Sequence, residues 1–270
     1  MENPRLVASD VDGTLLTPQD TLSERTVATI ARTQAAGVAF VLASGRPARW
    51  IPGVALAAGV RGYAVCANGA VLYDIAADRV LLAHRLDPVL LGDVAHAMWA
   101  ALPGITVAVE RIGDTATALG GYEFLTEEAY EHPWEDADVR TATRAELLGR
   151  PAVKLLFRTN EMTSDQLAGI ARDLVGDSVD VTYSSNVGMI EVSQHGITKG
   201  SGLAEVAGRL DVPAELVVAF GDMPNDVPML RWAGLGVAMG NGHPEALAAA
   251  DEVTLSNAKD GVAAVLERWF

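Results

Sequence analysis

Two aspartates that stand two residues apart follow an apolar run close to the start of the chain. Residues 6–9 read LVAS, and Asp10 and Asp12 come next, followed by Gly13 and Thr14. Side chains at i and i+2 of an extended backbone point to the same face, and a turn at Gly13 would bring Asp12 beside Asp10. Two such carboxylates repel by roughly 4 kcal/mol at an effective dielectric of about 20. A compensating cation or proton is therefore needed, which predicts a metal site with a carboxylate nucleophile.

Three further segments place polar side chains after an apolar strand or before a helix. They are Ser44-Gly45-Arg46 after residues 38–43, Lys199 before a predicted helix, and Asp222, Asn225 and Asp226 after residues 216–220. Ligands of open parallel sheets bind outside the carboxyl ends of the strands. We therefore expect Asp10, Ser44 and Asp222 to lie at one edge of the sheet.

The residue types at this edge suit phosphoryl transfer. Asp10 and Asp222 offer the hard oxygen ligands that Mg²⁺ prefers. A carboxylate such as Asp10 also serves as a nucleophile that carries an aspartyl-phosphate. Asp12 is placed to protonate the leaving oxygen and later to activate water.

Other residues in these segments suit the binding of a phosphate group. The Ser44 hydroxyl and the Gly45 amide offer hydrogen bonds to a phosphate oxygen, next to the start of a predicted helix. Lys199 supplies the cation that offsets the carboxylates and the developing charge. Arg46 has two open interpretations, a contact with substrate or a surface salt bridge.

Composition limits the classes of partner. The chain has 270 residues, of which 50% are hydrophobic, and a net charge of −15. A strongly acidic chain without a basic cluster is not expected to bind nucleic acid. Membrane binding is not expected either, because no apolar run reaches the 18 residues of a spanning helix. A single cysteine, Cys66, and the lack of a signal peptide predict a cytoplasmic protein.

Strand-like and helix-like segments alternate along most of the chain. Apolar runs of strand length occupy residues 5–9, 38–43, 63–66, 71–73, 105–109, 153–158, 179–183, 189–192, 216–220, 235–238 and 253–255. Several of them are continuous, which indicates strands buried on both faces. Helical patterns occupy residues 24–36, 47–58, 88–101, 164–175, 200–210, 226–233, 244–250 and 261–269.

This alternation predicts an α/β fold with a Rossmann-like, doubly wound parallel sheet. The middle of the chain shows more alternating strands, which are typical of an antiparallel sheet with helices on one side. We therefore expect a core formed by residues 1–83 and 191–270, with an inserted α+β domain at residues 84–190.

The four polar segments, in this order, resemble the haloacid dehalogenase (HAD) superfamily. Asp10–Thr14 resembles the first motif of that superfamily, Ser44 the second, Lys199 the third and residues 221–226 the fourth. Residues 68–70 (NGA) and 196–200 (GITKG) are similar to the Cof-type branch, whose type IIB cap is inserted between the second and third motifs. The predicted insert lies at that place.

The resemblance implies a Mg²⁺-dependent phosphatase with Asp10 as nucleophile and Asp12 as acid and base. It also implies that Asp10, the backbone carbonyl of Asp12 and Asp222 bind the metal. Asn225 would bind phosphate or orient Lys199, and Asp226 would lie behind the metal ligands. The implied substrate is a small phosphate ester, such as a sugar phosphate.

Two other functions are compatible with the same residues. A phosphomutase or another phosphotransferase would pass the phosphoryl group to a hydroxyl instead of water, so phosphate release distinguishes it from a phosphatase. A protein that only binds a phosphorylated ligand would not need a nucleophile. The intact set of Asp10, Asp12, Lys199 and Asp222 disfavours that interpretation.

Overall fold

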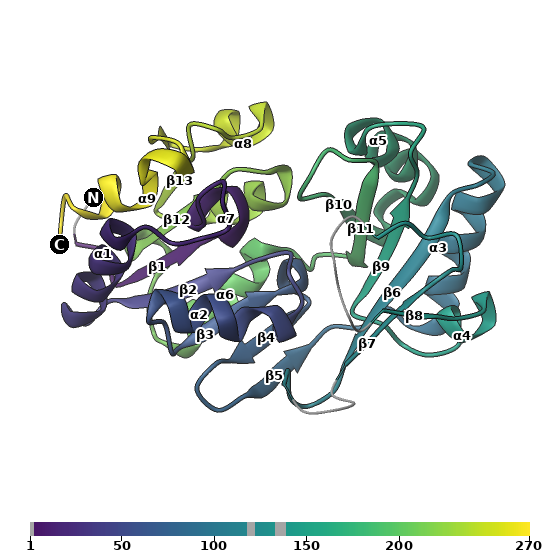
Figure 1. Cartoon of the computed structure of the whole chain (residues 1–270), viewed down its shortest axis with the longest axis horizontal. Helices are drawn as coiled ribbons and strands as arrows, with labels where there is room; N and C mark the ends of the chain where they lie inside the picture. Colours follow the sequence, from purple (N-terminus) through teal and green to yellow (C-terminus); the bar gives the residue numbers. More distant parts are fainter. Residues whose placement is uncertain (1–2, 118–121, 133–138) are drawn as a thin grey trace. The chain divides into compact units, whose positions relative to one another are not determined.

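The chain forms two compact units. The computed structural model describes residues 3–117, 122–132 and 139–270 (Figure 1). The first unit consists of Met1–Leu81 and Thr198–Phe270, and the second of Leu82–Ile197. The second unit is therefore an insertion between two segments of the first.

A mostly parallel sheet forms the centre of the first unit. Its strand order is β14-β13-β12-β1-β2-β3-β4-β5. Neighbouring strands from β14 to β3 are parallel, whereas β4 runs antiparallel to β3. The strands are β1 (Leu6–Ser9), β2 (Ala39–Ala43), β3 (Tyr63–Cys66), β4 (Val71–Asp74), β5 (Arg79–Ala83), β12 (Val217–Gly221), β13 (Leu235–Ala238) and β14 (Glu252–Val253).

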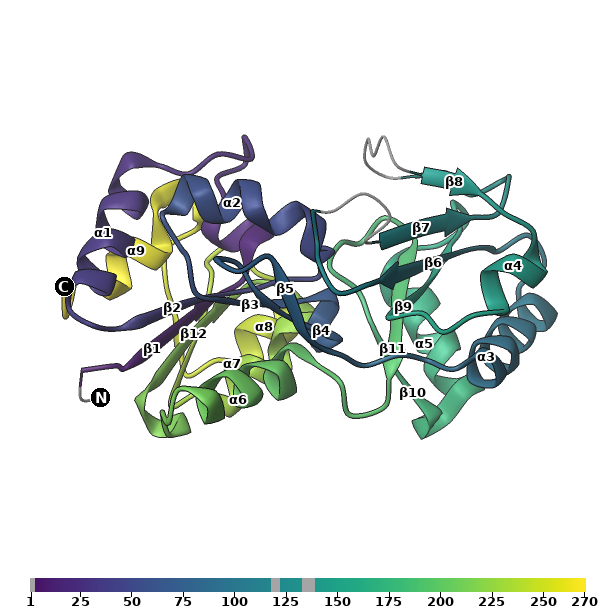
Figure 2. The ribbon, with the colours of Figure 1, turned by 90° about the horizontal axis from the view of Figure 1, so that it is seen from below.

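Helices cover both faces of this sheet. In Figure 2, α1, α2 and α9 lie on one face and α6, α7 and α8 on the other. All residues of β1 and β12 are accordingly buried. The helices are α1 (Glu24–Ala35), α2 (Ile51–Ala58), α6 (Lys199–Arg209), α7 (Val227–Trp232), α8 (Pro244–Ala249) and α9 (Gly261–Leu266). The predicted doubly wound α/β class is confirmed.

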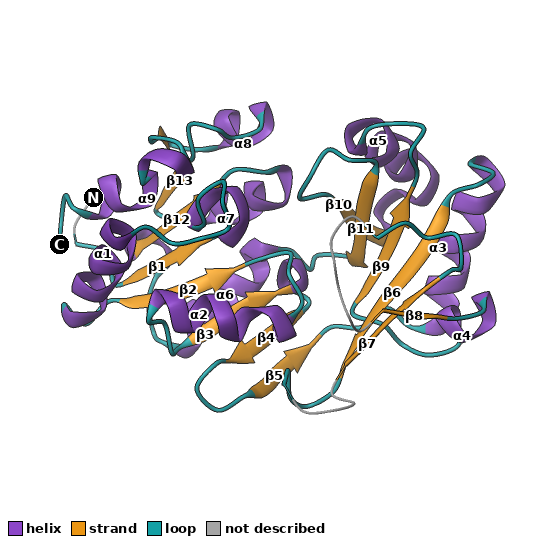
Figure 3. Cartoon of the chain, viewed as in Figure 1, coloured by secondary structure: helices purple, strands orange, loops and turns teal. Residues whose placement is uncertain are grey.

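The second unit has a six-stranded sheet in the order β10-β11-β9-β6-β7-β8. Its pairs are antiparallel except for β7 with β8. The strands are β6 (Thr106–Ile112), β7 (Tyr122–Thr126), β8 (Val139–Thr141), β9 (Lys154–Arg158), β10 (Val179–Thr182) and β11 (Met189–Gln194). The helices α3 (Pro88–Ala101), α4 (Arg144–Leu148) and α5 (Ser164–Val175) flank it, as Figure 3 shows by colour.

The ends of the inserted unit differ from the predicted range of 84–190. The predicted boundary after Ile190 falls inside β11, which pairs with β9 and β10 and so belongs wholly to the second unit. The compact second unit runs from Leu82, near the end of β5, to Ile197, whereas the predicted start at residue 84 directly follows β5. Separately, none of the helices in the described part of the chain is long and apolar enough to cross a membrane.

Candidate active site

Asp10 occupies the position directly after the central strand β1. Its backbone N–H donates to the Phe220 carbonyl of the neighbouring strand β12, at 2.9 Å. The residue is only 4% exposed. The parallel pairing of β1 with β12 thus places a buried carboxylate at the carboxyl edge of the sheet, as the sequence predicts.

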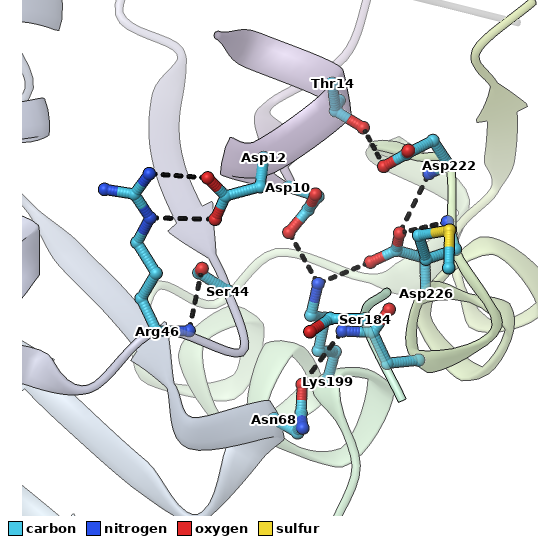
Figure 4. Close-up of polar contacts among 12 residues, drawn as sticks. Asp10, Asp12, Thr14, Ser44, Arg46, Asn68, Ser184, Lys199, Asp222 and Asp226 are labelled. Atoms are coloured by element: carbon cyan, nitrogen blue, oxygen red, sulfur yellow. Dashed lines mark hydrogen bonds and ion pairs between the residues drawn. The ribbon is translucent and has the colours of Figure 1, made fainter. Parts of the chain in front are cut away.

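Lys199 links two of the carboxylates (Figure 4). Its Nζ lies 2.6 Å from Asp10 Oδ1 and 2.6 Å from Asp226 Oδ1. The side chain is fully buried at the first position of α6. Burial alone would lower the pKa of Lys199, but the charges of Asp10 and Asp226 outweigh it and raise that pKa. Lys199 is therefore a permanent cation in this site.

Asp226 uses both of its carboxylate oxygens within the protein. Oδ1 accepts from Lys199, and Oδ2 accepts from the backbone N–H groups of Asp222 and Met223 at 2.8 and 2.9 Å. Asp226 therefore fixes both the ammonium group and the loop that carries Asp222.

The carboxylate of Asp222 is held from the other side by the segment that follows β1. Asp222 Oδ1 accepts from the Thr14 hydroxyl at 3.0 Å. A Cβ at Gly13 would lie 2.3 Å from Asp222 Oδ2, and Gly13 has a φ of +74°. Glycine is thus needed at position 13 for the turn and for the space that Asp222 occupies.

The carboxylates of the site exceed its cations. Among the described residues, Lys199 pairs with Asp10 and Asp226, and Arg46 pairs with the exposed Asp12, so that these residues and Asp222 carry two negative charges more than the two cations offset. Burial, followed by the neighbouring carboxylates, raises the pKa of Asp10 despite Lys199. Burial and the charge of Asp226 raise the pKa of Asp222 to about 7.

These groups fit a divalent cation. Oxygen atoms of Asp10, Asp222 and Asp226 all lie within 4.8 Å of one another. Because both oxygens of Asp226 accept hydrogen bonds from the protein, the Asp10 and Asp222 carboxylates are the better candidate ligands. Hard oxygen donors with an excess charge of −2 suit a hard divalent cation.

Asp12 is turned toward Arg46 and not toward Lys199 (Figure 4). The guanidinium binds the carboxylate in a bidentate manner, with Nε 2.8 Å from Asp12 Oδ2. The Asp12 side chain is 47% exposed, in contrast to the buried Asp10. Of the two interpretations of Arg46, the structure shows an ion pair, and this pair lies within the candidate site.

Ser44 directly follows β2 and shapes the turn that carries Arg46. Its Oγ accepts from the Arg46 backbone N–H at 3.0 Å, and its own N–H donates to the Val65 carbonyl at 2.8 Å. Gly45 lies between them, and Ser44 is 1% exposed. The turn is thereby anchored to β3, beside the edge where Asp10 lies.

Asn225 has a partner that sequence analysis did not assign to the site. Its Nδ2 donates to Asn68 Oδ1 at 3.0 Å, and both residues are buried. A third asparagine, Asn241, donates from Nδ2 to the Gly13 carbonyl at 2.8 Å. Thr14, Asn68 and Asn241 were not predicted as site residues, because each acts through a neighbour distant in sequence.

Comparisons with known proteins identify the family of the chain. Residues 7–266 match the family described as haloacid dehalogenase-like hydrolase. The chain is 28% identical to the 5-amino-6-(5-phospho-D-ribitylamino)uracil phosphatase YitU of Bacillus subtilis, over 99% of this chain and 98% of that protein. It is 27% identical to an HMP-PP phosphatase of Enterobacter sp., over 90% of this chain and 87% of that protein.

A solved structure with the same fold is that of BT4131, described as a HAD subclass IIB sugar phosphatase. It superposes with a TM-score of 0.78 at 18% identity, over 98% of each chain. At this identity the likeness concerns the fold, which includes the inserted second unit.

Proposed function

Because the chain belongs to the haloacid dehalogenase-like hydrolase family, we propose that it is a Mg²⁺-dependent phosphatase that hydrolyses small phosphate monoesters through an aspartyl-phosphate. The predicted family is confirmed by the match over residues 7–266. The observation that carries the proposal is the buried Asp10–Lys199–Asp226 group, with Asp222 beside it.

The proposed reaction starts at Asp10. A carboxylate oxygen of Asp10 attacks phosphorus, the ester P–O bond breaks, and the leaving oxygen takes a proton from Asp12. Asp12 then accepts a proton from a water molecule whose oxygen attacks the same phosphorus. The bond to Asp10 breaks, and inorganic phosphate and the free carboxylate are formed.

Lys199 supports both steps through its position. Its Nζ lies 2.6 Å from Asp10 Oδ1, so the ammonium group orients the nucleophile. It also offsets the charge on the transferred group, and such preorganised charge is a major source of catalysis in phosphoryl transfer.

The proposed metal ligands are the carboxylates of Asp10 and Asp222 and the backbone carbonyl of Asp12. Bound Mg²⁺ would supply the positive charge that neutralises phosphate oxygens and lets nucleophile and substrate approach. Asp226 is proposed to hold the Asp222 loop in place, as its hydrogen bonds to the backbone of Asp222 and Met223 suggest.

The phosphate group is proposed to bind at Ser44, the Gly45 amide, Lys199 and Asn225. Arg46 holds the ionised Asp12 carboxylate at the edge of this set, so it is proposed to orient Asp12 as the base of the second step and to contact substrate. The inserted unit is proposed to act as a type IIB cap that selects the substrate.

The class of substrate is proposed from the charge of the chain and from the ribityl phosphate in the name of one relative. The net charge of −15 disfavours polyanions such as nucleic acids or nucleoside triphosphates. The two relatives are named as phosphatases of a phosphoribitylamino-uracil and of HMP-PP. We propose a phosphorylated metabolite with a polar, uncharged leaving group, such as a sugar or polyol phosphate.

The test is a phosphate-release screen over phosphorylated metabolites in the presence of Mg²⁺. Wild type should release phosphate, and Asp10→Asn should not. Adding sugar hydroxyl acceptors separates hydrolysis from transfer, because a phosphotransferase would form a new phosphate ester instead of free phosphate. No release from any metabolite or from p-nitrophenyl phosphate would refute the proposal.

A further inference from the structure

The segment that follows β3 has an unusual backbone. Three consecutive residues have positive φ, namely Ala67 at 50°, Asn68 at 56° and Gly69 at 103°. Residues other than glycine seldom adopt this region, although asparagine does so more readily than alanine. Strained backbone persists only where the surroundings enforce it, and it is concentrated at functional sites.

Two parts of the candidate site enforce this conformation. The backbone N–H groups of Ala67 and Asn68 donate to the Arg46 and Ser44 carbonyls, at 2.9 and 3.1 Å. A Cβ at Gly69 would lie 2.1 Å from the carbonyl oxygen of Thr198, the residue before Lys199. The segment is thus held between the turn that carries Ser44 and the start of α6.

The Asn68 side chain contacts a third part of the site. Asn68 is 3% exposed, and its Oδ1 accepts from Asn225 Nδ2. Asn225 is 4% exposed, and its own Oδ1 is buried without a hydrogen-bond partner among the described residues. Asn68 therefore accepts one of the two Nδ2 hydrogens of Asn225 and fixes the direction of the amide, so that the second Nδ2 hydrogen remains for an acceptor such as a phosphate oxygen.

We propose that Asn68 is a positioning residue, which sets the orientation of the Asn225 amide for phosphate binding. The proposal rests on the proposed function and deepens it, because it explains why an asparagine with positive φ contacts Asn225, one of the proposed phosphate-binding residues. Loss of the Asn68 amide would free Asn225 to rotate, so a buried polar group would lose its fixed direction.

A double-mutant cycle tests this role. Asn68→Gly removes the amide, and glycine adopts positive φ without strain. Ala67→Gly is the matched control, because it changes the same left-handed segment without touching Asn225. Each variant is made in wild type and in Asn225→Ala, and kcat and KM are measured for p-nitrophenyl phosphate with Mg²⁺.

We expect Asn68→Gly to lower kcat/KM by about tenfold in wild type and to change it little in Asn225→Ala. Ala67→Gly should leave kcat/KM unchanged in both backgrounds. Equal loss from Asn68→Gly in the two backgrounds would overturn the positioning role, because a general structural defect acts regardless of Asn225.

Two additions keep the test decisive. The variant Asn68→Asp also tolerates positive φ and keeps an acceptor opposite Asn225. Adding Asn225→Ala to Asn68→Asp should therefore lower kcat/KM further. An unchanged kcat/KM in that double variant would overturn the proposal. The same double-mutant cycle is repeated with a second readout, the rise in Tm that inorganic phosphate causes in each variant. If wild type binds phosphate but releases none from esters, the proposed function fails, whereas the coupling still decides the role of Asn68.

Discussion

The excess of buried carboxylate makes a specific prediction about pH, Mg²⁺ and stability. In the metal-free protein, burial and Asp226 raise the pKa of Asp222 from 3.8 to about 7. This shift corresponds to on the order of 4 kcal/mol between the folded and unfolded states. Asp10, whose pKa is raised mainly by burial, contributes in the same direction.

The sign follows from which state holds the proton. Below pH 4 Asp222 is protonated in both states. Between pH 4 and pH 7 the unfolded chain has lost this proton while the folded protein retains it, so the free energy of unfolding falls by up to about 1.4 kcal/mol per pH unit. Above pH 7 the folded state loses the proton as well, so the stability that protonated Asp222 gave the folded protein at low pH is gone.

Bound Mg²⁺ should remove this dependence, because metal binding requires the ionised carboxylates. We expect Mg²⁺ to raise the free energy of unfolding more at pH 8 than at pH 5. Urea unfolding followed by circular dichroism at pH 5, 6, 7 and 8, with chelator or with Mg²⁺, measures both effects.

Two variants complete this experiment. Asp222→Asn should reduce the pH dependence of the metal-free protein to the part that Asp10 contributes and abolish most of the stabilisation by Mg²⁺. Asp93→Asn, at an exposed position of α3, should change neither. A metal-free stability that is constant or rises between pH 5 and pH 7 would refute the account of the site as an uncompensated carboxylate cluster.

Four further predictions concern the reaction. Asp10→Asn should abolish turnover while Tm is retained or rises, because one repelling charge is removed; turnover within tenfold of wild type would exclude Asp10 as nucleophile. Asp12→Asn should slow turnover by about 10²–10⁴-fold with Mg²⁺ affinity retained, since its carbonyl survives, and calorimetric loss of Mg²⁺ binding would contradict this division. Ca²⁺ should not replace Mg²⁺ in the phosphate-release assay, because it takes more ligands at longer distances, and full activity after chelation would exclude the metal. A sugar monophosphate should have a higher kcat/KM than its bisphosphate at low salt, and the reverse order would rule out the charge argument.

The sequence predicted the central strands well, because burial on both faces leaves a continuous apolar run. It missed β7, β8 and α4, which show no such run, and also β5, although residues 80–83 (VLLA) are apolar. The strand β8 has two exposed residues out of three, so its conformation depends on pairing with β7. The five-residue α4 has one buried residue, Leu147, and begins at the capping box of Thr143 and Glu146.

In the site too, residues that directly follow a strand with a clear apolar pattern were predicted, whereas some residues with partners distant in sequence were missed. Asp10, Ser44 and Asp222 were predicted together because each directly follows a parallel strand, and the ends of such strands share an edge. Thr14 and Asn68 were not predicted, because their partners lie 208 and 157 residues away in sequence. Both residues lie in segments that resemble family motifs, but a motif does not name the distant partner of a short uncharged side chain.

The central position of β1 has a consequence for synthesis on the ribosome. This strand lies between β2 and β12, yet about 200 residues, including the whole inserted unit, separate it from β12. At common translation rates, β1 would wait about 10–40 s for that neighbour.

During this interval one edge of an apolar strand has no partner within its own chain, and Asp10 is already in place without Lys199. The inserted unit is complete in sequence before the first unit, so it is free to fold first. The nascent chain is therefore expected to depend on chaperones most strongly between the synthesis of β2 and that of β12.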